Sequence, residues 1–404
     1  MKVNTKAKTK TDKIVALMGD QAVAEAMRQI EPDVVAAYPI TPQTEIVMTF
    51  SQFVADGRVK TELIPVESEH SAMSACVGSV AAGARTMTAT SANGLALMWE
   101  VVYIAASTRL PMVMPVVNRA LSGPINIHCD HSDTMGARDS GWMQVYAENP
   151  EEAYENTIVA VRIAEHTGIL LPIMVCQDGF ITSHGVEGVR VFPDEMVKKF
   201  IGEYRPAQKT LLDVDNPVTY GPLDLQDYYF EHKRQQSEAM NNSLKIIPEV
   251  LAEFNKTFNR NHDLIEEYKL ADAEIGIVVM SSTAGTARGV VDELRKEGIK
   301  AGLLKPRFFR PFPKDRIVKA LSHLKAVAVL DRSEAFSATG GPLFNEIKAA
   351  LYESKERPLM TDYIFGLGGR DIFPQDIKKV YKDLEAITKA GKVESPHNFL
   401  GVRD

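Results

Sequence analysis

Thr41 and Glu69 each stand where a helix is expected to begin, and both side chains can bond a ligand. Thr41 lies in VVAAYPITPQTEI, where a strand-like run enters a turn and Pro42 follows as a favoured first helical residue. A helix starting there points free N–H groups at the carboxyl edge of a sheet, where open α/β folds bind anions. From spacing alone, capping is the favoured role of Thr41, because helix caps are common and active-site threonines are not.

Glu69 lies in PVESEHSAMSACVGSVAAGA, a helical pattern rich in small residues that permit close backbone approach. The helix dipole stabilises Glu67 and Glu69 at its start by about 0.3–1 kcal/mol each, which explains Glu69 without a ligand. A carboxylate among small residues can instead be partly buried and bond a ligand nitrogen. The pattern leaves both roles open.

Two further segments follow predicted strands. The turn Ser91–Gly94 comes after the run 85–90, and its backbone groups suit a ligand contact, although such a turn alone is weak evidence. Arg119 comes after the run 111–117, where its guanidinium can hold a carboxylate through two parallel hydrogen bonds. An ordinary surface ion pair explains Arg119 equally well.

The loop NIHCDHSDTMGARDSGW gathers His128, Asp130, His131 and Asp133, which are residue types that bind metals. Their spacing matches no metal motif, so a hydrogen-bonded loop network is the favoured interpretation and no metal ligand is assigned. The sequence has no GxSxG, GxGxxG or Walker A motif, so this chain is expected to carry no phosphate cradle of its own.

Composition excludes several classes of protein. The chain has 46 Lys plus Arg against 53 Asp plus Glu, a net charge of -7, which argues against nucleic acid or an anionic membrane as a partner. Its apolar runs are shorter than the roughly 20 residues of a membrane span. Cys76, Cys129 and Cys176 are far apart without a CxxC motif, which argues against a disulfide framework, a zinc site or a self-contained iron-sulfur cluster. We therefore expect a cytoplasmic protein.

The elements that must position these residues alternate between strand-like and helical patterns, which predicts a doubly wound α/β fold with a mostly parallel sheet. The predicted strands are 34–38, 63–66, 85–90, 111–117 and 169–176. The predicted helices are 22–29, 43–53, 69–84, 95–106 and 151–166. A second, smaller α/β domain is predicted from the runs 275–282 and 326–333 and the helices 284–297 and from 315.

These patterns divide the chain into four predicted segments. A flexible N-terminus covers 1–13, the first α/β domain 14–192, a connector 193–261 and the second α/β domain 262–404. The connector is rich in proline and polar residues and is expected to contain a helix over 244–258.

Seven motifs in this order resemble the alpha subunits of pyruvate:ferredoxin oxidoreductases (pyruvate synthases), of the 2-oxoacid:ferredoxin oxidoreductase family. The motifs are YPITPQTEI, PVESEHSAMSACVGSVAAGA, TATSANGLALMWEVVYIA, LPMVMPVVNRALS, CDHSDTMGARDSGW, CQDGFITSH and KPRFFRPFP. The resemblance covers nearly the whole chain and is weakest before residue 14 and between 193 and 261.

The resemblance implies a thiamine diphosphate enzyme of 2-oxo acids that is divided among subunits. This chain would supply a pyrimidine-binding domain and a transketolase-C-terminal-like domain. A beta subunit would hold the diphosphate, Mg²⁺ and a [4Fe-4S] cluster, while small subunits would carry ferredoxin-like clusters and contribute to coenzyme A binding. Ferredoxin would be the electron partner, with coenzyme A as co-substrate. The missing phosphate motif and cluster cysteines fit this division.

By motif, the resemblance implies that Glu69 is catalytic and bonds N1′ of the aminopyrimidine, where a carboxylate favours the imino tautomer. It implies that Thr41 and Arg119 bind the carboxylate and carbonyl of the substrate, and that Pro39, Ser91 and Asn93 contact the cofactor. Thr41 stands where relatives acting on oxalate have Arg, which favours a monocarboxylate.

The predicted function is therefore reversible oxidative decarboxylation of pyruvate to acetyl-CoA and CO₂, with electrons passed to ferredoxin. A sister enzyme for branched-chain 2-oxo acids or 2-oxoglutarate is the alternative within the class. An alternative of another class is a scaffold subunit without catalysis in a redox complex, because fold alone does not determine function.

Overall fold

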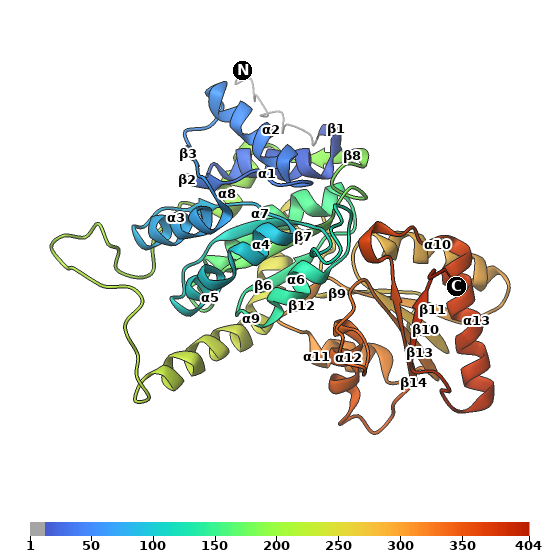
Figure 1. Cartoon of the computed structure of the whole chain (residues 1–404). Coiled ribbons are helices and arrows are strands. Elements are labelled where there is room, and N and C mark those ends of the chain that lie inside the picture. Colours follow the sequence, from blue (N-terminus) through green and yellow to red (C-terminus); the bar gives the residue numbers. More distant parts are fainter. Residues whose placement is uncertain (1–12, 404) are drawn as a thin grey trace, which may run out of the picture.

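The structure is a computed structural model that describes residues 13–403 (Figure 1). Two α/β parts lie side by side, the N-terminal one in blue to green and the C-terminal one in orange to red. The predicted flexible segment 1–13 lies outside the described residues except for Lys13, which begins a strand.

The N-terminal part is built on a seven-stranded sheet in the order β12-β6-β7-β5-β4-β2-β3. Its strands are β2 (Val34–Ala37), β3 (Glu62–Pro65), β4 (Thr86–Met87), β5 (Val113–Asn118), β6 (Met143–Tyr146), β7 (Ile173–Asp178) and β12 (Phe308–Arg310). All neighbours pair in parallel except β12, which is antiparallel to β6. The C-terminal ends of β2, β4, β5 and β7 therefore lie along one edge.

Helices cover both faces of this sheet, as the doubly wound prediction requires. They are α1 (Gly19–Ile30), α2 (Thr44–Ala55), α3 (Glu69–Ala81), α4 (Ala92–Leu97), α5 (Trp99–Ser107), α6 (Ser132–Gly136), α7 (Pro150–Ala164), α8 (Asp194–Ile201) and α9 (Tyr229–Phe258). Alternate residues of β5 enter two different cores, Val113 and Val117 on one face and Met114 and Val116 on the other. A two-stranded antiparallel sheet, β1 (Lys13–Met18) with β8 (Val186–Val191), packs beside α1.

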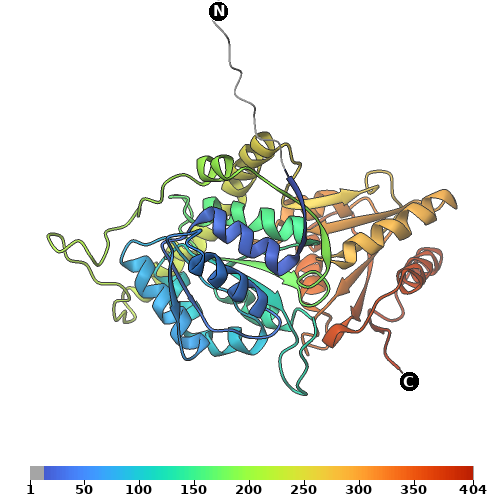
Figure 2. The same ribbon diagram turned by 90° about the horizontal axis from the view of Figure 1, so that it is seen from above.

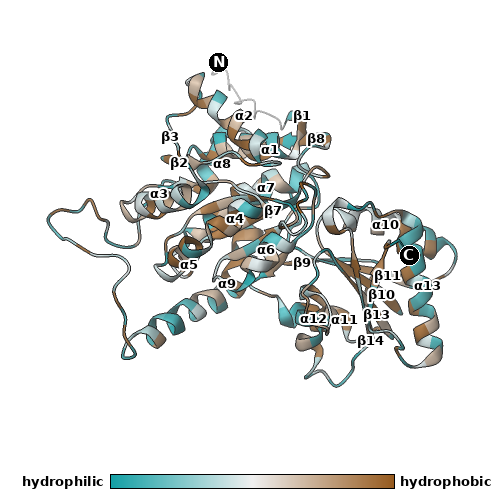
Figure 3. Ribbon diagram, viewed as in Figure 1, coloured by the Kyte–Doolittle hydropathy of each residue, from teal (hydrophilic) through white to brown (hydrophobic). Residues whose placement is uncertain are grey.

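The C-terminal part has a six-stranded sheet in the order β15-β14-β13-β10-β11-β9. Its strands are β9 (Ile265–Tyr268), β10 (Ile275–Val279), β11 (Ala301–Pro306), β13 (Ala326–Asp331), β14 (Leu359–Phe365) and β15 (His397–Leu400). The helices are α10 (Thr283–Lys296), α11 (Lys314–Leu321), α12 (Pro342–Leu351) and α13 (Pro374–Ala390). Strands β10, β11 and β13 are fully buried and mostly hydrophobic (Figure 3), as expected for strands covered on both faces.

Several local predictions differ from the structure. The helix predicted over 95–106 is two helices, α4 and α5, that meet at Met98. The helix predicted over 244–258 begins at Tyr229 and contains Pro248, so the connector is more helical than its composition indicates. The residues before this helix run out from the body without helix or strand (Figure 2). Strand β12, which lies beyond the predicted boundary at 261, joins the N-terminal sheet. The three boundaries between the predicted segments stay predictions.

The fold class agrees with the prediction of a doubly wound, mostly parallel sheet with a second α/β part. Within residues 13–403, no helix combines the length and the apolar character that crossing a bilayer requires.

Candidate functional site

Glu69 is the first residue of α3 and its side chain is buried, with 6% of the residue exposed. Helix α3 begins here because Ser68 caps it, accepting a hydrogen bond from the Ser71 backbone N–H. Within residues 13–403 no donor bonds the Glu69 carboxylate, so the cap is provided by Ser68 and not by Glu69. The helix dipole favours the charge but leaves both carboxylate oxygens free for another partner.

Further polar groups without partners follow β4 and end β5. Thr88, Thr90 and Ser91 are buried, and their hydroxyls have no hydrogen-bond partner within the described residues; the same is true of Asn118 Oδ1. A buried polar group without a partner costs roughly 1–3 kcal/mol, so four of them at one sheet edge indicate a ligand that would complete them.

Gly94 in α4 brings this edge against Glu69. A Cβ atom at Gly94 would lie 2.7 Å from Glu69 Oε1 and 2.5 Å from Thr90 Oγ1, so only glycine leaves both oxygens free. A carboxylate, several hydroxyls and a close backbone suit a flat ring with nitrogen donors and acceptors, which is the character of an aminopyrimidine. The residues present therefore fit the pyrimidine half of thiamine diphosphate.

The other predicted cofactor contacts are placed less deeply. Asn93 is exposed in the first turn of α4, and its Oδ1 accepts from Ser122 Oγ at 3.1 Å. Pro39 is exposed between β2 and the turn of residues 41–43. Neither residue has a contact that assigns it to a ligand, so their roles stay predictions.

Thr41 does not cap α2, and that prediction is wrong. The helix begins at Thr44 with Gln43 as its N-cap residue, because residues 41–43 form a separate turn in which Gln43 Oε1 accepts from the Ile40 backbone N–H at 3.2 Å. Thr41 is exposed, and its carbonyl oxygen accepts from Arg119 Nη1 at 3.0 Å. The structure therefore brings Thr41 and Arg119 together.

Arg119 follows the last residue of β5 and is buried, with 8% exposed. Its Nε donates to the carbonyl oxygen of Asn126 at 3.0 Å, and its Nη1 donates to that of Thr41. Two of its five N–H donors are thus used by neutral carbonyls, and three on Nη1 and Nη2 have no partner within residues 13–403. The guanidinium has no acidic partner within residues 13–403, so a surface ion pair does not hold Arg119 and its end remains free for a carboxylate.

Asp133 ties Arg119 to the turn that carries Ser91. One carboxylate oxygen accepts from the backbone N–H groups of Arg119 and Ala92, both at 3.0 Å, and the other accepts from Asn118 Nδ2 at 2.8 Å. Burial raises the pKa of Asp133 to about 6, against the lowering effect of these bonds. Asp133 therefore fixes the ends of β4 and β5 relative to each other.

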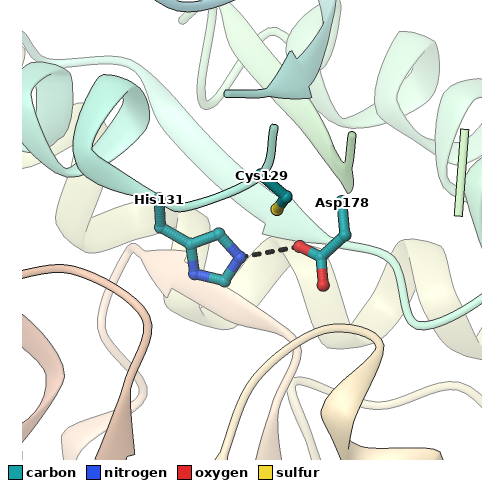
Figure 4. A group of neighbouring side chains, drawn as sticks. All are labelled: Cys129, His131 and Asp178. Atoms are coloured by element: carbon teal, nitrogen blue, oxygen red, sulfur yellow. Dashed lines mark hydrogen bonds and ion pairs between the residues drawn. The ribbon is translucent and has the colours of Figure 1, made fainter. Parts of the chain in front are cut away.

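The polar loop that contains Asp130 and His131 forms a hydrogen-bonded network, as predicted. Asp130 accepts from Ser132 N and Oγ, and His131 Nε2 lies 2.7 Å from Asp178 Oδ1 at the end of β7. Figure 4 shows Cys129 beside this pair, and the three side chains lie close enough to share an ion. Arg332 Nη1 also bonds Asp178 at 2.9 Å, and a cation beside a guanidinium is disfavoured, so we assign this group as a structural pair.

Burial alone would raise the pKa of Asp178, but Arg332 and His131 outweigh it and hold that pKa well below its usual range. Burial raises the pKa of the Cys129 thiol, which keeps it neutral. The network links the two α/β parts directly, since Arg332 follows β13.

Sequence reasoning identified Glu69, Thr41 and Arg119 and a possible ligand contact at the turn Ser91–Gly94, but it assigned no role to Thr88, Thr90 or Asp133. Asp133 was named only within the polar loop, because its bonds to Ala92 and Arg119 depend on how distant strand ends meet. Gly94, in a turn after a predicted strand, is the one signal that indicated close approach of a ligand. A cavity of about 670 Å³ lies elsewhere, between α5 and α9, and none of these site residues lines it.

Two family models match this chain, and the first of them covers the residues of the candidate site. Residues 25–251 match the family model described as pyruvate flavodoxin/ferredoxin oxidoreductase, thiamine diphosphate-binding. Residues 273–377 match the model described as pyruvate:ferredoxin oxidoreductase core domain II. The first match includes Thr41, Glu69 and Arg119.

Among curated proteins, the pyruvate synthase subunit PorA of Thermotoga maritima is 60% identical over 96% of this chain and 98% of its own length. The subunit of the same name from Pyrococcus furiosus is 45% identical over 96% of this chain and 97% of its own. The ketoisovalerate oxidoreductase subunit VorA of Pyrococcus horikoshii is 44% identical over 93% of this chain and 95% of its own.

Among solved structures, a 2-oxoglutarate:ferredoxin oxidoreductase from Magnetococcus marinus, with 2-oxoglutarate, coenzyme A and succinyl-CoA bound, superposes with a TM-score of 0.71 at 20% identity. The match covers 92% of this chain, which spans 65% of that one. A split-gene transketolase in an inactive beta4 tetramer gives a TM-score of 0.52 at 12% identity, covering 93% of this chain and 98% of that chain. At these identities the likeness shows the fold.

Proposed function

Because the chain belongs to the pyruvate:ferredoxin oxidoreductase family, we propose that it is the alpha subunit of an enzyme that converts pyruvate and coenzyme A reversibly to acetyl-CoA and CO₂. The electrons pass to ferredoxin. The family matches confirm the resemblance carried by the seven motifs. Pyruvate is favoured over a branched-chain 2-oxo acid because identity is 60% to a pyruvate synthase subunit and 44% to a ketoisovalerate oxidoreductase subunit.

The observation that carries this proposal is the edge of buried polar groups without partners beside Glu69. Glu69, Ser91 and the backbone near Gly94 would hold the aminopyrimidine of thiamine diphosphate. Bound there, thiamine diphosphate supplies the carbanion-stabilising chemistry that cleavage next to a 2-oxo group needs. The Glu69 carboxylate would accept a hydrogen bond from a ring nitrogen and hold the proton that moves between ring and carboxylate.

Arg119 and Thr41 would bind the substrate. The free Nη1 and Nη2 donors of Arg119 can grip one carboxylate through two parallel hydrogen bonds, and the low exposure of Arg119 strengthens that attraction. The backbone carbonyl of Thr41 orients the Arg119 guanidinium. The side-chain hydroxyl of the exposed Thr41 would be available to the substrate. A single cationic side chain with a neutral threonine suits a monocarboxylate.

Partner subunits would supply the rest of the site. We assign the diphosphate, Mg²⁺ and [4Fe-4S] clusters to a beta subunit and small ferredoxin-like subunits, with coenzyme A contacts shared among subunits. A [4Fe-4S] cluster is ordinarily held by four cysteine thiolates, and this chain has three cysteines, all of them unpaired. Unpaired thiols also suit the reducing cytoplasm, which we propose as the compartment.

Reconstitution tests the proposal. The chain is co-expressed with its partner subunits, and ferredoxin reduction is measured with pyruvate, 2-oxoisovalerate and 2-oxoglutarate in the presence of coenzyme A. We expect the highest kcat/KM for pyruvate, and a colourless, inactive protein when the chain is purified alone. A higher kcat/KM for 2-oxoisovalerate would favour the sister enzyme, and a complex that binds no thiamine diphosphate would favour the scaffold.

A further inference from the structure

The loop of residues 120–132, here called the Arg119 loop, shapes the surroundings of the guanidinium. Its Asn126 carbonyl accepts from Arg119 Nε at 3.0 Å, and the loop closes on itself where Ala120 N donates to the His128 carbonyl at 2.9 Å. Asn126 also fixes its own turn, since its Oδ1 accepts from the His128 backbone N–H at 2.6 Å. The orientation of the Arg119 side chain therefore depends on the position of Asn126.

Asn126 is held by the C-terminal part of the chain. Its Nδ2 donates to the carbonyl of Gly368 at 3.1 Å, a bond between residues 242 positions apart. The Gly368 N–H donates in turn to Asp130 Oδ2 at 3.1 Å, and the Gly369 N–H donates to the Cys129 carbonyl at 2.6 Å. Three bonds thus connect the Arg119 loop to residues 366–369, here called the glycine turn.

The glycine turn requires glycine for two reasons. Gly366, Gly368 and Gly369 have φ angles of 64°, 58° and 79°, which residues with side chains rarely adopt. In addition, a Cβ atom at Gly368 would lie 2.5 Å from Asn126 Nδ2, and one at Gly369 would lie 2.4 Å from His128 Cβ. The turn can approach the loop this closely only without side chains.

A buried ion pair fixes the base of this contact. Arg332, which bonds Asp178, donates through Nε to the Gly366 carbonyl at 3.5 Å and accepts at its own carbonyl from the His131 N–H at 2.8 Å. The glycine turn is therefore anchored on the side chain of Arg332 and the end of the Arg119 loop on its backbone carbonyl, so one residue supports both segments.

We infer that the glycine turn is a positioning element for substrate binding: through Asn126, the C-terminal part aims Arg119 at the carboxylate of the 2-oxo acid. This inference rests on the proposed role of Arg119. It gives the C-terminal part a task in the active site, and it makes Asn126 and Gly368 positioning residues. Neither residue has a contact with Glu69. Binding of thiamine diphosphate at the cofactor edge, meaning Glu69, Thr88, Thr90 and Ser91, should therefore not depend on them.

The test compares Gly368→Ala and Asn126→Ala with Gly391→Ala in the reconstituted complex. Gly391 ends α13 with a φ of 66° and has no atom within 4 Å of a Cβ, so its variant carries the same backbone strain without touching the loop. Gly368→Ala and Asn126→Ala should raise KM for pyruvate roughly 5- to 50-fold, the effect of one or two lost hydrogen bonds, while kcat changes less than about twofold. Affinity for thiamine diphosphate and the properties of Gly391→Ala should match the unaltered complex.

Two further measurements separate the possible failures. Hydrogen exchange of the peptide covering 119–129 should be faster in Gly368→Ala and Asn126→Ala than in Gly391→Ala. If Arg119→Lys raises KM but both variants behave like Gly391→Ala in KM and exchange, the inference is overturned and the proposed function stands. If Arg119→Lys leaves KM unchanged, the role of Arg119 is wrong and the inference falls with it.

Discussion

The cofactor edge and the junction between the two α/β parts both bury polar groups, but only at the junction are the buried charges paired. The junction is here the cluster of Lys305 with Glu148, Glu152 and Glu266. At the junction, Lys305 is 1% exposed and contacts Glu148, Glu152 and Glu266 at 2.8–2.9 Å, so the buried charge is fully compensated. At the edge, Glu69, Thr90 and Ser91 are also buried, yet no donor or acceptor within residues 13–403 pairs with their side-chain oxygens. Next to the junction, Asn156 Nδ2 and Arg307 Nε also lack a hydrogen-bond partner within the described residues, but the carboxylates and the lysine of the junction are paired. At the edge, the unpaired hydroxyls gather beside an unpaired carboxylate, and this grouping favours a ligand there.

The comparison also separates two kinds of charge. Burial would raise the pKa of Glu152, but Arg307 and Lys305 outweigh it and lower the pKa to about 2. The guanidinium of Arg119 bonds only carbonyl oxygens within residues 13–403, so its charge remains available. Substitutions at the edge should therefore change the catalytic rates and leave the free energy of unfolding nearly constant. Substitutions at the junction should change the free energy of unfolding and leave the catalytic rates nearly constant.

Replacing Glu69 by Gln should have the largest effect. Proton exchange at C2 of bound thiamine diphosphate should slow by a factor of about 100 to 10,000, the usual range for a lost acid-base group. Nuclear magnetic resonance of quenched samples of the reconstituted complex measures this rate. Glu67→Gln is the matched control, because Glu67 is exposed two residues away and its carboxylate accepts a hydrogen bond from the Ser71 hydroxyl. Equal exchange in both variants would return Glu69 to the role of a dipole partner.

Arg119→Ala should lower kcat/KM for pyruvate by about 30- to 5,000-fold, because a desolvated carboxylate without its partner costs roughly 2–5 kcal/mol. Arg119→Lys keeps the charge but cannot reach both carbonyls and the substrate, so an intermediate loss is expected. Steady-state kinetics with a thiamine diphosphate titration measures both. A change in cofactor affinity with unaltered pyruvate kinetics would contradict the substrate role.

Glu152→Gln should reduce stability in a pH-dependent way. The pKa of Glu152 is about 2 in the folded chain and 4.5 ordinarily, so the unfolded state binds more protons between these values. Its contribution, on the order of 3 kcal/mol, is present above pH 4.5 and lost as pH falls towards 2. Urea unfolding of the full chain should give a difference between unaltered and variant protein at pH 7 that shrinks below pH 4.5. A difference independent of pH would show that the charge of Glu152 is not what matters.

Thr41→Ala should have the smallest effect. The carbonyl that orients Arg119 is retained, and a lost neutral hydrogen bond costs about 0.5–1.5 kcal/mol, or about a 2- to 13-fold loss in kcat/KM for pyruvate. The same kinetic assay measures it. A loss as large as that of Arg119→Ala would mean that the hydroxyl does more than make one hydrogen bond.

The sequence was sufficient for features that depend on local order along the chain. Glu69 at a helix start and Arg119 after a strand were placed by pattern, and the motifs identified the family. Thr41 was assigned wrongly as a cap because the turn of residues 41–43 moves the cap from Thr41 to Gln43 and delays the helix by two residues. The contact of Asn126 with Gly368 and the pairing of β12 with β6 join distant segments, so no local spacing predicts them.

The most direct test of the contrast between edge and junction is hydrogen exchange in the reconstituted complex with and without thiamine diphosphate. Peptides covering 67–76 and 88–97 carry Glu69 and the unpaired hydroxyls, and they should exchange more slowly when the cofactor is bound. Peptides covering 148–156 and 301–307 carry the paired junction and should not change. Protection at the junction with none around Glu69 would contradict the assignment of this edge as the cofactor site.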